Sequence, residues 1–212
     1  MKNMKKILAI VLAVVLLVGA VVGGTLAWFI DQTDTIENTF TVGNIDIELD
    51  ETNTNLDGDN DVNTNDYKMI PGWTITKDPK ATVLAGSEDC YLFVKLDKSA
   101  NFDSFMEYKM AEGWIKLETD AEGNALDGVY YREVITDDED QEFYVIDGNK
   151  VAVKATVTKA MMDDILDPAK PNVTKPTLDV SAYAVQLWKT NKDVANAKFT
   201  PAEAWKTVNS ST

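Results

Sequence analysis

The sequence predicts an all-β domain, a β-sandwich with a few short helices, behind an apolar N-terminal segment. Short runs in which apolar and polar residues alternate recur along the chain, and turn-forming residues separate them. β-Branched and aromatic residues fill these runs, whereas helical periodicity is evident in only two places. We therefore expect about seven to nine strands, at the spacing typical of a sandwich.

The N-terminus has the three parts of a secretory signal. Three lysines among the first six residues precede an apolar run of 16 residues, 7–22. Small or tolerated residues then lead to a cleavage site between Ala27 and Trp28. We expect residues 1–27 to be removed and residues 28–212 to form a single sandwich domain. The alternative is an uncleaved membrane anchor, because residues 26–30 could lengthen the run toward the ~20 residues that span a bilayer.

The strand candidates follow in chain order. The first has its apolar residues at Phe40 and Val42 and then at 45, 47 and 49, with a break at Gly43-Asn44. In the next, Cys90 falls on the apolar face, which predicts a core residue rather than a reactive thiol. The later candidates are 128–135, 142–146, 150–158 and 177–188, and the connections 136–141 and 147–149 have the composition of hairpin turns.

Two helices are predicted, over residues 159–166 and 200–208. The second has the stronger signal, because Thr200 can accept a hydrogen bond as N-cap and Glu203 completes a capping box. Pro201 suits the first helical position. The apolar face of this helix should pack on a sheet.

Charge and composition exclude several functions. The net charge of −15 argues against nucleic acid or an anionic membrane as a partner, since both require a cationic surface. Membrane contact is expected only through an uncleaved signal. The chain contains no histidine, which removes His-dependent catalysis and His-ligated zinc. Cys90 is the only cysteine, so no internal disulfide forms, as is common in exported Gram-positive proteins.

The block "GGTLAWFIDQTDTIENTFTVGNIDIEL", residues 23–49, resembles the N-terminus of TasA/camelysin proteins, whose signals are cut by a SipW-type signal peptidase. Residues 69–96 and 181–205 are also similar to this group. The resemblance implies a jelly-roll sandwich that is secreted or held at the cell surface. It also implies self-assembly into biofilm-matrix fibres, with the N-terminal segment of one subunit completing the sheet of the next.

In that interpretation the added strand spans about Trp28 to Phe40. Its apolar residues are Trp28, Phe29, Ile30, Ile36 and Phe40. The alternative is that this segment is the first strand of the subunit's own sheet. Some members of the family are classed as metallopeptidases, but this chain has no HExxH motif, so we expect no enzyme.

An acidic segment, residues 55–66, is the candidate for metal binding. Its oxygen-bearing side chains fall at the ligand positions of an EF-hand-like loop, which predicts calcium as the one candidate cofactor. Asn60 replaces the usual glycine and Asp66 the usual glutamate, so a solvated acidic insertion is the alternative. The candidate ligands are Asn55, Asp57, Asp59, Asp61, Asn63 and Asp66.

The sequence thus predicts a secreted structural protein that self-assembles into fibres. A monomeric, calcium-stabilised adhesin or ligand-binding module is the second interpretation, and a camelysin-like metallopeptidase is a remote third.

Overall fold

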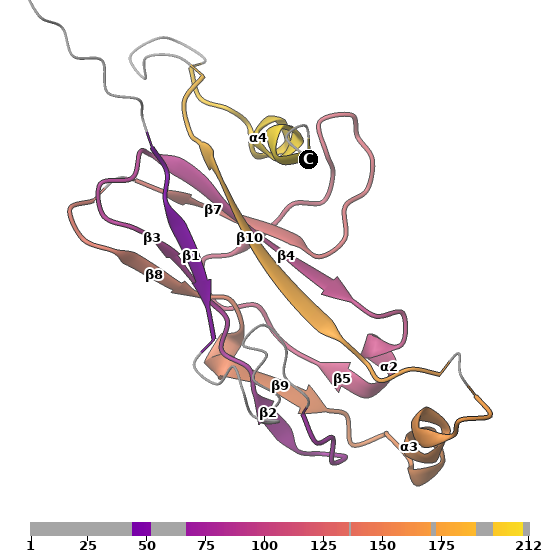
Figure 1. Ribbon diagram of the computed structural model, residues 1–212. Coiled ribbons are helices and arrows are strands. Elements are labelled where there is room, and N and C mark those ends of the chain that lie inside the picture. Colours follow the sequence, from indigo (N-terminus) through magenta and orange to yellow (C-terminus); the bar gives the residue numbers. More distant parts are fainter. Residues whose placement is uncertain (1–43, 52–66, 136, 171–172, 190–196, 210–212) are drawn as a thin grey trace, which may run out of the picture. The chain divides into compact units, whose positions relative to one another are not determined.

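The computed structural model describes residues 44–51, 67–135, 137–170, 173–189 and 197–209. The chain divides into two units, Met1–Val42 and Gly43–Thr212, and all described residues belong to the second. Antiparallel strands dominate this unit, as Figure 1 shows, so the predicted all-β class is confirmed.

The described residues contain ten strands, three α-helices and one turn of 3₁₀-helix. The strands are β1 (Ile47–Asp50), β2 (Thr74–Thr76), β3 (Lys80–Val83), β4 (Cys90–Lys98), β5 (Met106–Glu107), β6 (Ile115–Lys116), β7 (Val129–Val134), β8 (Gln141–Tyr144), β9 (Lys150–Val153) and β10 (Leu178–Gln186). The helices are α2 (Phe102–Phe105), α3 (Lys159–Leu166) and α4 (Pro201–Asn209), with η1 at Asp147–Asn149.

Two sheets form the sandwich, and every pairing in them is antiparallel. One has the order β1-β3-β8 and the other β10-β4-β7-β6. Their inner faces share one buried cluster, which includes Ala81 and Val83 of β3 and Leu92 and Val94 of β4. A third sheet, β2-β9-β5, also contributes to this cluster through Val151 and was not predicted.

Strand β4 is the centre of the larger sheet, paired over nine residues with β10 and over six with β7. Its even-numbered residues, including Cys90, point into the cluster between the sheets. The odd-numbered Tyr91 and Phe93 point to the other face, where α4 covers them. Burial raises the pKa of the Cys90 thiol to about 12, and the side chain is 0% exposed, which confirms its assignment to the core.

Helix α4 begins with the predicted capping box. The Thr200 N–H donates to Glu203 Oε2 (2.8 Å), and the Glu203 N–H donates to Thr200 Oγ1 (3.3 Å). The Lys189 ammonium, followed by the backbone and side chain of Thr200, lowers the pKa of Glu203 from 4.5 to about 2. Trp205, 3% exposed, packs on Phe93 with ring centroids 5.2 Å apart. The helix therefore covers the outer face of the larger sheet, as predicted.

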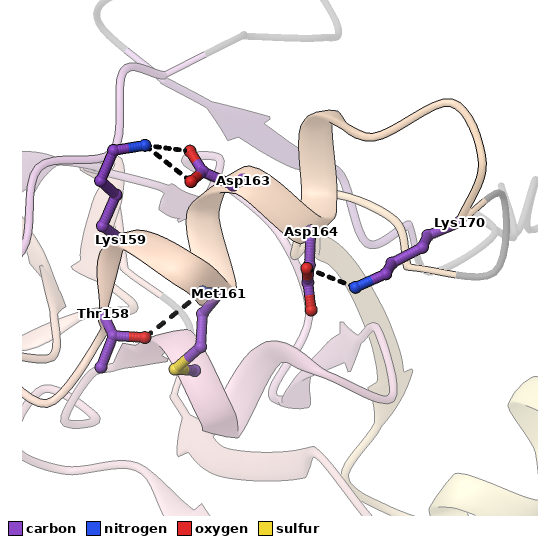
Figure 2. Close-up of polar contacts among 6 residues, drawn as sticks. All are labelled: Thr158, Lys159, Met161, Asp163, Asp164 and Lys170. Carbon is purple, nitrogen blue, oxygen red and sulfur yellow. Dashed lines mark hydrogen bonds and ion pairs between the residues drawn. The ribbon is translucent and has the colours of Figure 1, made fainter.

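Helix α3 has no fully buried residue, but Met161, Met162 and Ile165 pack partly buried against the cluster between the sheets. Figure 2 shows Thr158 Oγ1 accepting from the Met161 N–H at the first turn (3.3 Å). Lys159 pairs with Asp163 one turn later (2.6 Å), and Lys170 pairs with Asp164 (2.5 Å) across the end of the helix. The helix ends at Leu166, where the sequence predicts its end, because Pro168 disfavours a helical backbone at Asp167, which is extended.

The two connections predicted as hairpin turns join different sheets instead. Strand β7 pairs with β4 and β8 pairs with β3, so the chain passes from one sheet of the sandwich to the other between these two strands. The acidic connection is attached to the turn after β3, where the Ala85 N–H donates to Asp140 Oδ1 (2.8 Å). Residues 147–149 lead from β8 to β9 in the third sheet. Turn composition indicated where the chain bends but not which strands pair.

Candidate assembly edges

All the site residues predicted from sequence lie outside the described residues. They are the cleavage residues Ala27 and Trp28, the strand residues Phe29, Ile30, Ile36 and Phe40, and the candidate ligands within 55–66. The described residues supply the surfaces on which an added strand could pair.

Strand β10 has one paired edge and one free edge. At its two ends the Ser99 N–H donates to the Thr177 carbonyl (3.1 Å), and the Leu187 N–H donates to the Asp89 carbonyl (2.8 Å). Alternate residues of an antiparallel strand face the same neighbour, so the odd-numbered residues of β10 face β4. The even-numbered residues then direct their N–H and C=O groups outward, away from β4. These residues are Leu178, Val180, Ala182, Ala184 and Gln186.

The free edge of β10 lacks the features that usually protect an edge strand. Its nine residues pair with β4 in continuous register, without a bulge, over a length of about 30 Å. Within β10 there is no proline or lysine, and Asp179 is the only charged residue. In the part of the chain that the structure describes, no strand pairs with this edge. Such an edge is a ready template for another strand.

Among the described strands, β1 provides a second, shorter free edge next to β10. The Leu84 N–H donates to the Asp46 carbonyl (2.9 Å), so even-numbered residues of this strand face β3. Ile47 and Leu49 therefore direct their backbone groups outward. β1 and β10 are the outer strands of the two facing sheets, and they contact each other (Figure 1). We call these two free edges together the open side of the sandwich.

The core is incompletely covered at the open side. Apolar side chains of both edge strands pack against the cluster between the sheets, yet all of them are only partly buried. They are Ile45, Ile47 and Leu49 in and just before β1, and Leu178, Val180, Ala182 and Ala184 in β10. A further strand with apolar side chains on one face would remove this surface from water.

The opposite side of the sandwich is closed by side chains. There Arg132 of β7 lies over the ring of Phe143 of β8, with Cζ 3.8 Å from the ring centroid, and over Trp114 at 5.3 Å. The Trp114 indole N–H donates to the Tyr144 carbonyl (2.9 Å), which joins the segment before β6 to β8. Burial lowers the pKa of Arg132. We call Trp114, Arg132, Phe143 and Tyr144 the closed side.

The closed side was not predicted from sequence. Arg132 is the only arginine of the chain, and that singularity is the one signal that could have drawn attention to it. Its Nε atom is buried and has no hydrogen-bond partner among the described residues. Among the described residues, the guanidinium is held by stacking on the rings of Phe143 and Trp114.

A partly buried ion pair lies at one end of the acidic segment. Glu51 is the last described residue before this segment, and its carboxylate lies 2.6 Å from Lys77 Nζ, with both side chains about 15% exposed. Tyr67 is the first residue after it. Burial, followed by the charges of Glu51 and Asp78, raises the pKa of Tyr67 to about 12. The candidate calcium ligands themselves lie between these two ends, outside the described residues.

The described residues do not fit a catalytic zinc ion. They contain no group of three acidic, cysteine or histidine side chains arranged to hold a metal. The sequence has no histidine, and the Cys90 thiol is buried with a raised pKa. No helix among the described residues is long and apolar enough to cross a membrane.

These features define a predominantly antiparallel β protein with one open and one closed side. A family model described as camelysin metallo-endopeptidase matches residues 2–84, a region that ends one residue after β3. The match supports the resemblance to camelysin/TasA proteins that residues 23–49 show. No curated protein and no solved structure matches the chain significantly.

Proposed function

We propose that this chain is a secreted structural protein that assembles into fibres at the cell surface or in a biofilm matrix. In each contact, residues Trp28–Phe40 of one copy add to the free β10 edge of the next. The free β10 edge is the observation that carries this proposal, because it offers nine residues of unprotected backbone pairing beside a partly covered core.

The sequence pattern of the N-terminal segment suits that edge. From 28 to 42 the even positions include Trp28, Ile30, Ile36 and Phe40, while the odd positions after Phe29 are threonines and acids. One face of the added strand would therefore carry most of the apolar residues, interrupted by Gln32, Asp34 and Asn38, and the other face would be polar. The apolar face would lie toward the partly covered core and the threonine-rich face toward solvent.

The test deletes residues 28–40 and measures the folding and assembly of the remaining protein. The secreted protein lacking residues 28–40 should fold, stay monomeric by sedimentation, and terminate growing wild-type fibres, because it still has an acceptor edge but cannot donate. A point variant, Phe40→Asp, should act in the same way, whereas the matched change Thr39→Asp on the polar face should leave assembly intact. Polymers that form as before in electron micrographs would refute the proposal. Loss of the folded circular-dichroism signal on deletion would instead place the segment in its own sheet.

Export through a SipW-type signal peptidase is part of the same proposal. The positive and apolar segment 1–22, with a cleavage site after Ala27, supports it. N-terminal sequencing of protein from culture supernatant should give Trp28 as the first residue. Recovery of only membrane-bound protein with Met1 retained would show an anchor instead.

Calcium binding by residues 55–66 is a separate proposal about a cofactor. The spacing of the oxygen-bearing residues supports it, and Glu51 and Lys77 fix one end of the segment. Calorimetry with calcium should show heat that Asp57→Asn together with Asp59→Asn removes, and calcium should raise the melting temperature. A monomeric, calcium-stabilised adhesin becomes the better interpretation if calcium binds and no fibres form.

The family description favours a metallo-endopeptidase as a second candidate function. The described residues do not fit a zinc site, so they support no catalytic step through such a metal. The purified protein should leave casein intact, and cleavage that a chelator abolishes would establish the peptidase instead.

A further inference from the structure

The closed side occupies an edge that could otherwise accept a strand. The Val145 N–H donates to the Pro79 carbonyl (2.9 Å), so odd-numbered residues of β8 face β3. Glu142 and Tyr144 then direct their backbone groups outward, along the other outer edge of the smaller sheet. If no other part of the chain covered this edge, it could pair with an added strand as the open side can.

The chain covers this edge with its own groups. The Tyr144 carbonyl accepts the Trp114 indole N–H (2.9 Å). Just beyond β8, the Ala111 N–H donates to the Val145 carbonyl (3.0 Å) and Met110 forms a bridge with Ile146. These contacts leave about one outward-facing residue of β8 with unpaired backbone groups, which is too few for stable strand pairing.

The position of Trp114 depends on Arg132. Trp114 lies directly opposite Arg132 when the β6–β7 register is extended by one residue, and the guanidinium stacks between Trp114 and Phe143. The backbone of Gly113 lies against this stack, since a Cβ atom at 113 would be 2.8 Å from Arg132 Nη2. The indole is therefore fixed in the orientation that meets Tyr144.

We propose that Trp114, positioned by Arg132, prevents strand addition at β8 and so restricts assembly to the open side. The consequence is polarity: each subunit has one accepting side and one donor segment, which gives an unbranched fibre. Only the consequence for fibres rests on the proposed function, because blocking of the β8 edge is a property of the single subunit.

The experiment uses the full secreted chain with three single changes. Trp114→Phe keeps a ring but removes the N–H, Arg132→Lys keeps the charge but loses the planar stack, and Trp73→Phe replaces a tryptophan that is 63% exposed as the matched control. Each is also made together with Phe40→Asp, which disables the donor segment. Hydrogen exchange of the peptide covering 141–145 and sedimentation velocity are measured over a range of protein concentrations, with near-UV circular dichroism as the check of folding.

Trp114→Phe and Arg132→Lys should show β8 protection that rises with protein concentration. In the Phe40→Asp background, where no donor segment is available, they should shift from monomer to a dimer in which the β8 edges of two copies pair. Trp73→Phe should show neither. Folded Trp114→Phe and Arg132→Lys proteins that stay monomeric, with β8 exchange independent of concentration, would overturn the proposal. If Phe40→Asp alone polymerises like the wild type, the donor-strand proposal fails, and the comparison of β8 exchange between Trp114→Phe and Trp73→Phe still decides whether this edge is blocked.

Discussion

Replacement of Ala182 by proline should stop assembly while leaving the subunit folded. The Ala182 N–H faces away from β4, so Ala182→Pro removes no hydrogen bond of the β10–β4 ladder. Proline is tolerated on edge strands where its missing N–H would have faced solvent. We therefore expect the free energy of unfolding of the subunit to change by no more than about 1 kcal/mol.

The effect on assembly follows from the same geometry. A strand added along β10 would exchange hydrogen bonds with the outward-facing residues, of which Ala182 is the central one. Ala182→Pro removes one donor, and its ring occupies the space of the neighbouring bond. At about 1 kcal/mol net for each of two bonds, subunit association should weaken by about 2 kcal/mol, or roughly 30-fold.

The neighbouring residue provides the matched control. Ser181 lies opposite Lys95 and directs its N–H toward β4, so Ser181→Pro should destabilise the subunit by about 1–3 kcal/mol. Urea unfolding measures stability, and the critical concentration for fibre formation measures association. The reasoning is refuted if Ala182→Pro raises no critical concentration, or if Ser181→Pro leaves stability unchanged.

Three further predictions concern the fold. Gly128→Ala should destabilise the protein by about 3 kcal/mol or more, because Gly128 has φ +71° and a Cβ there would lie 2.2 Å from the Leu96 carbonyl oxygen. Gly123 has φ +86° but lies in open space, so the control Gly123→Ala should lower the free energy of unfolding in urea by only about 1 kcal/mol. Glu203→Gln should destabilise the protein at pH 7 but progressively less between pH 4.5 and 2. The lowered pKa of Glu203 stabilises the fold above the pKa of the unfolded state, and this stabilisation is lost as the pH falls through the pKa of the folded state. A difference in free energy of unfolding between variant and wild type that is the same at pH 4.5 and pH 2 would contradict this. Cys90 should react with a thiol reagent only at the rate of unfolding, and rapid labelling of the native protein would contradict its buried position.

The elements with strong local signals could be predicted from the sequence. The strands β4 and β10 have nine residues each and are rich in apolar residues, and the capping box of Thr200 and Glu203 defines the start of α4. The third sheet could not be predicted in this way. Its outer strands have three and two residues, which is too short for a period of two to show.

The candidate site needed information that no local pattern contains. The residues from 177 to 188 indicate a long strand, but a free edge is defined by the absence of a neighbouring strand. The stack of Arg132 on Phe143 joins strands from two different sheets, so it depends on their packing. For the same reason the connection between β7 and β8 was predicted as a hairpin although it crosses between sheets.

Single-amide hydrogen exchange of β10, compared between monomer and fibre, tests the central claim most directly. In the monomer the odd-numbered amides are already protected by β4, and those of Val180, Ala182 and Ala184 should exchange freely. Assembly should protect these three amides and leave the odd-numbered ones unchanged. Fibres in which the amides of Val180, Ala182 and Ala184 still exchange as in the monomer would show that no strand adds at β10.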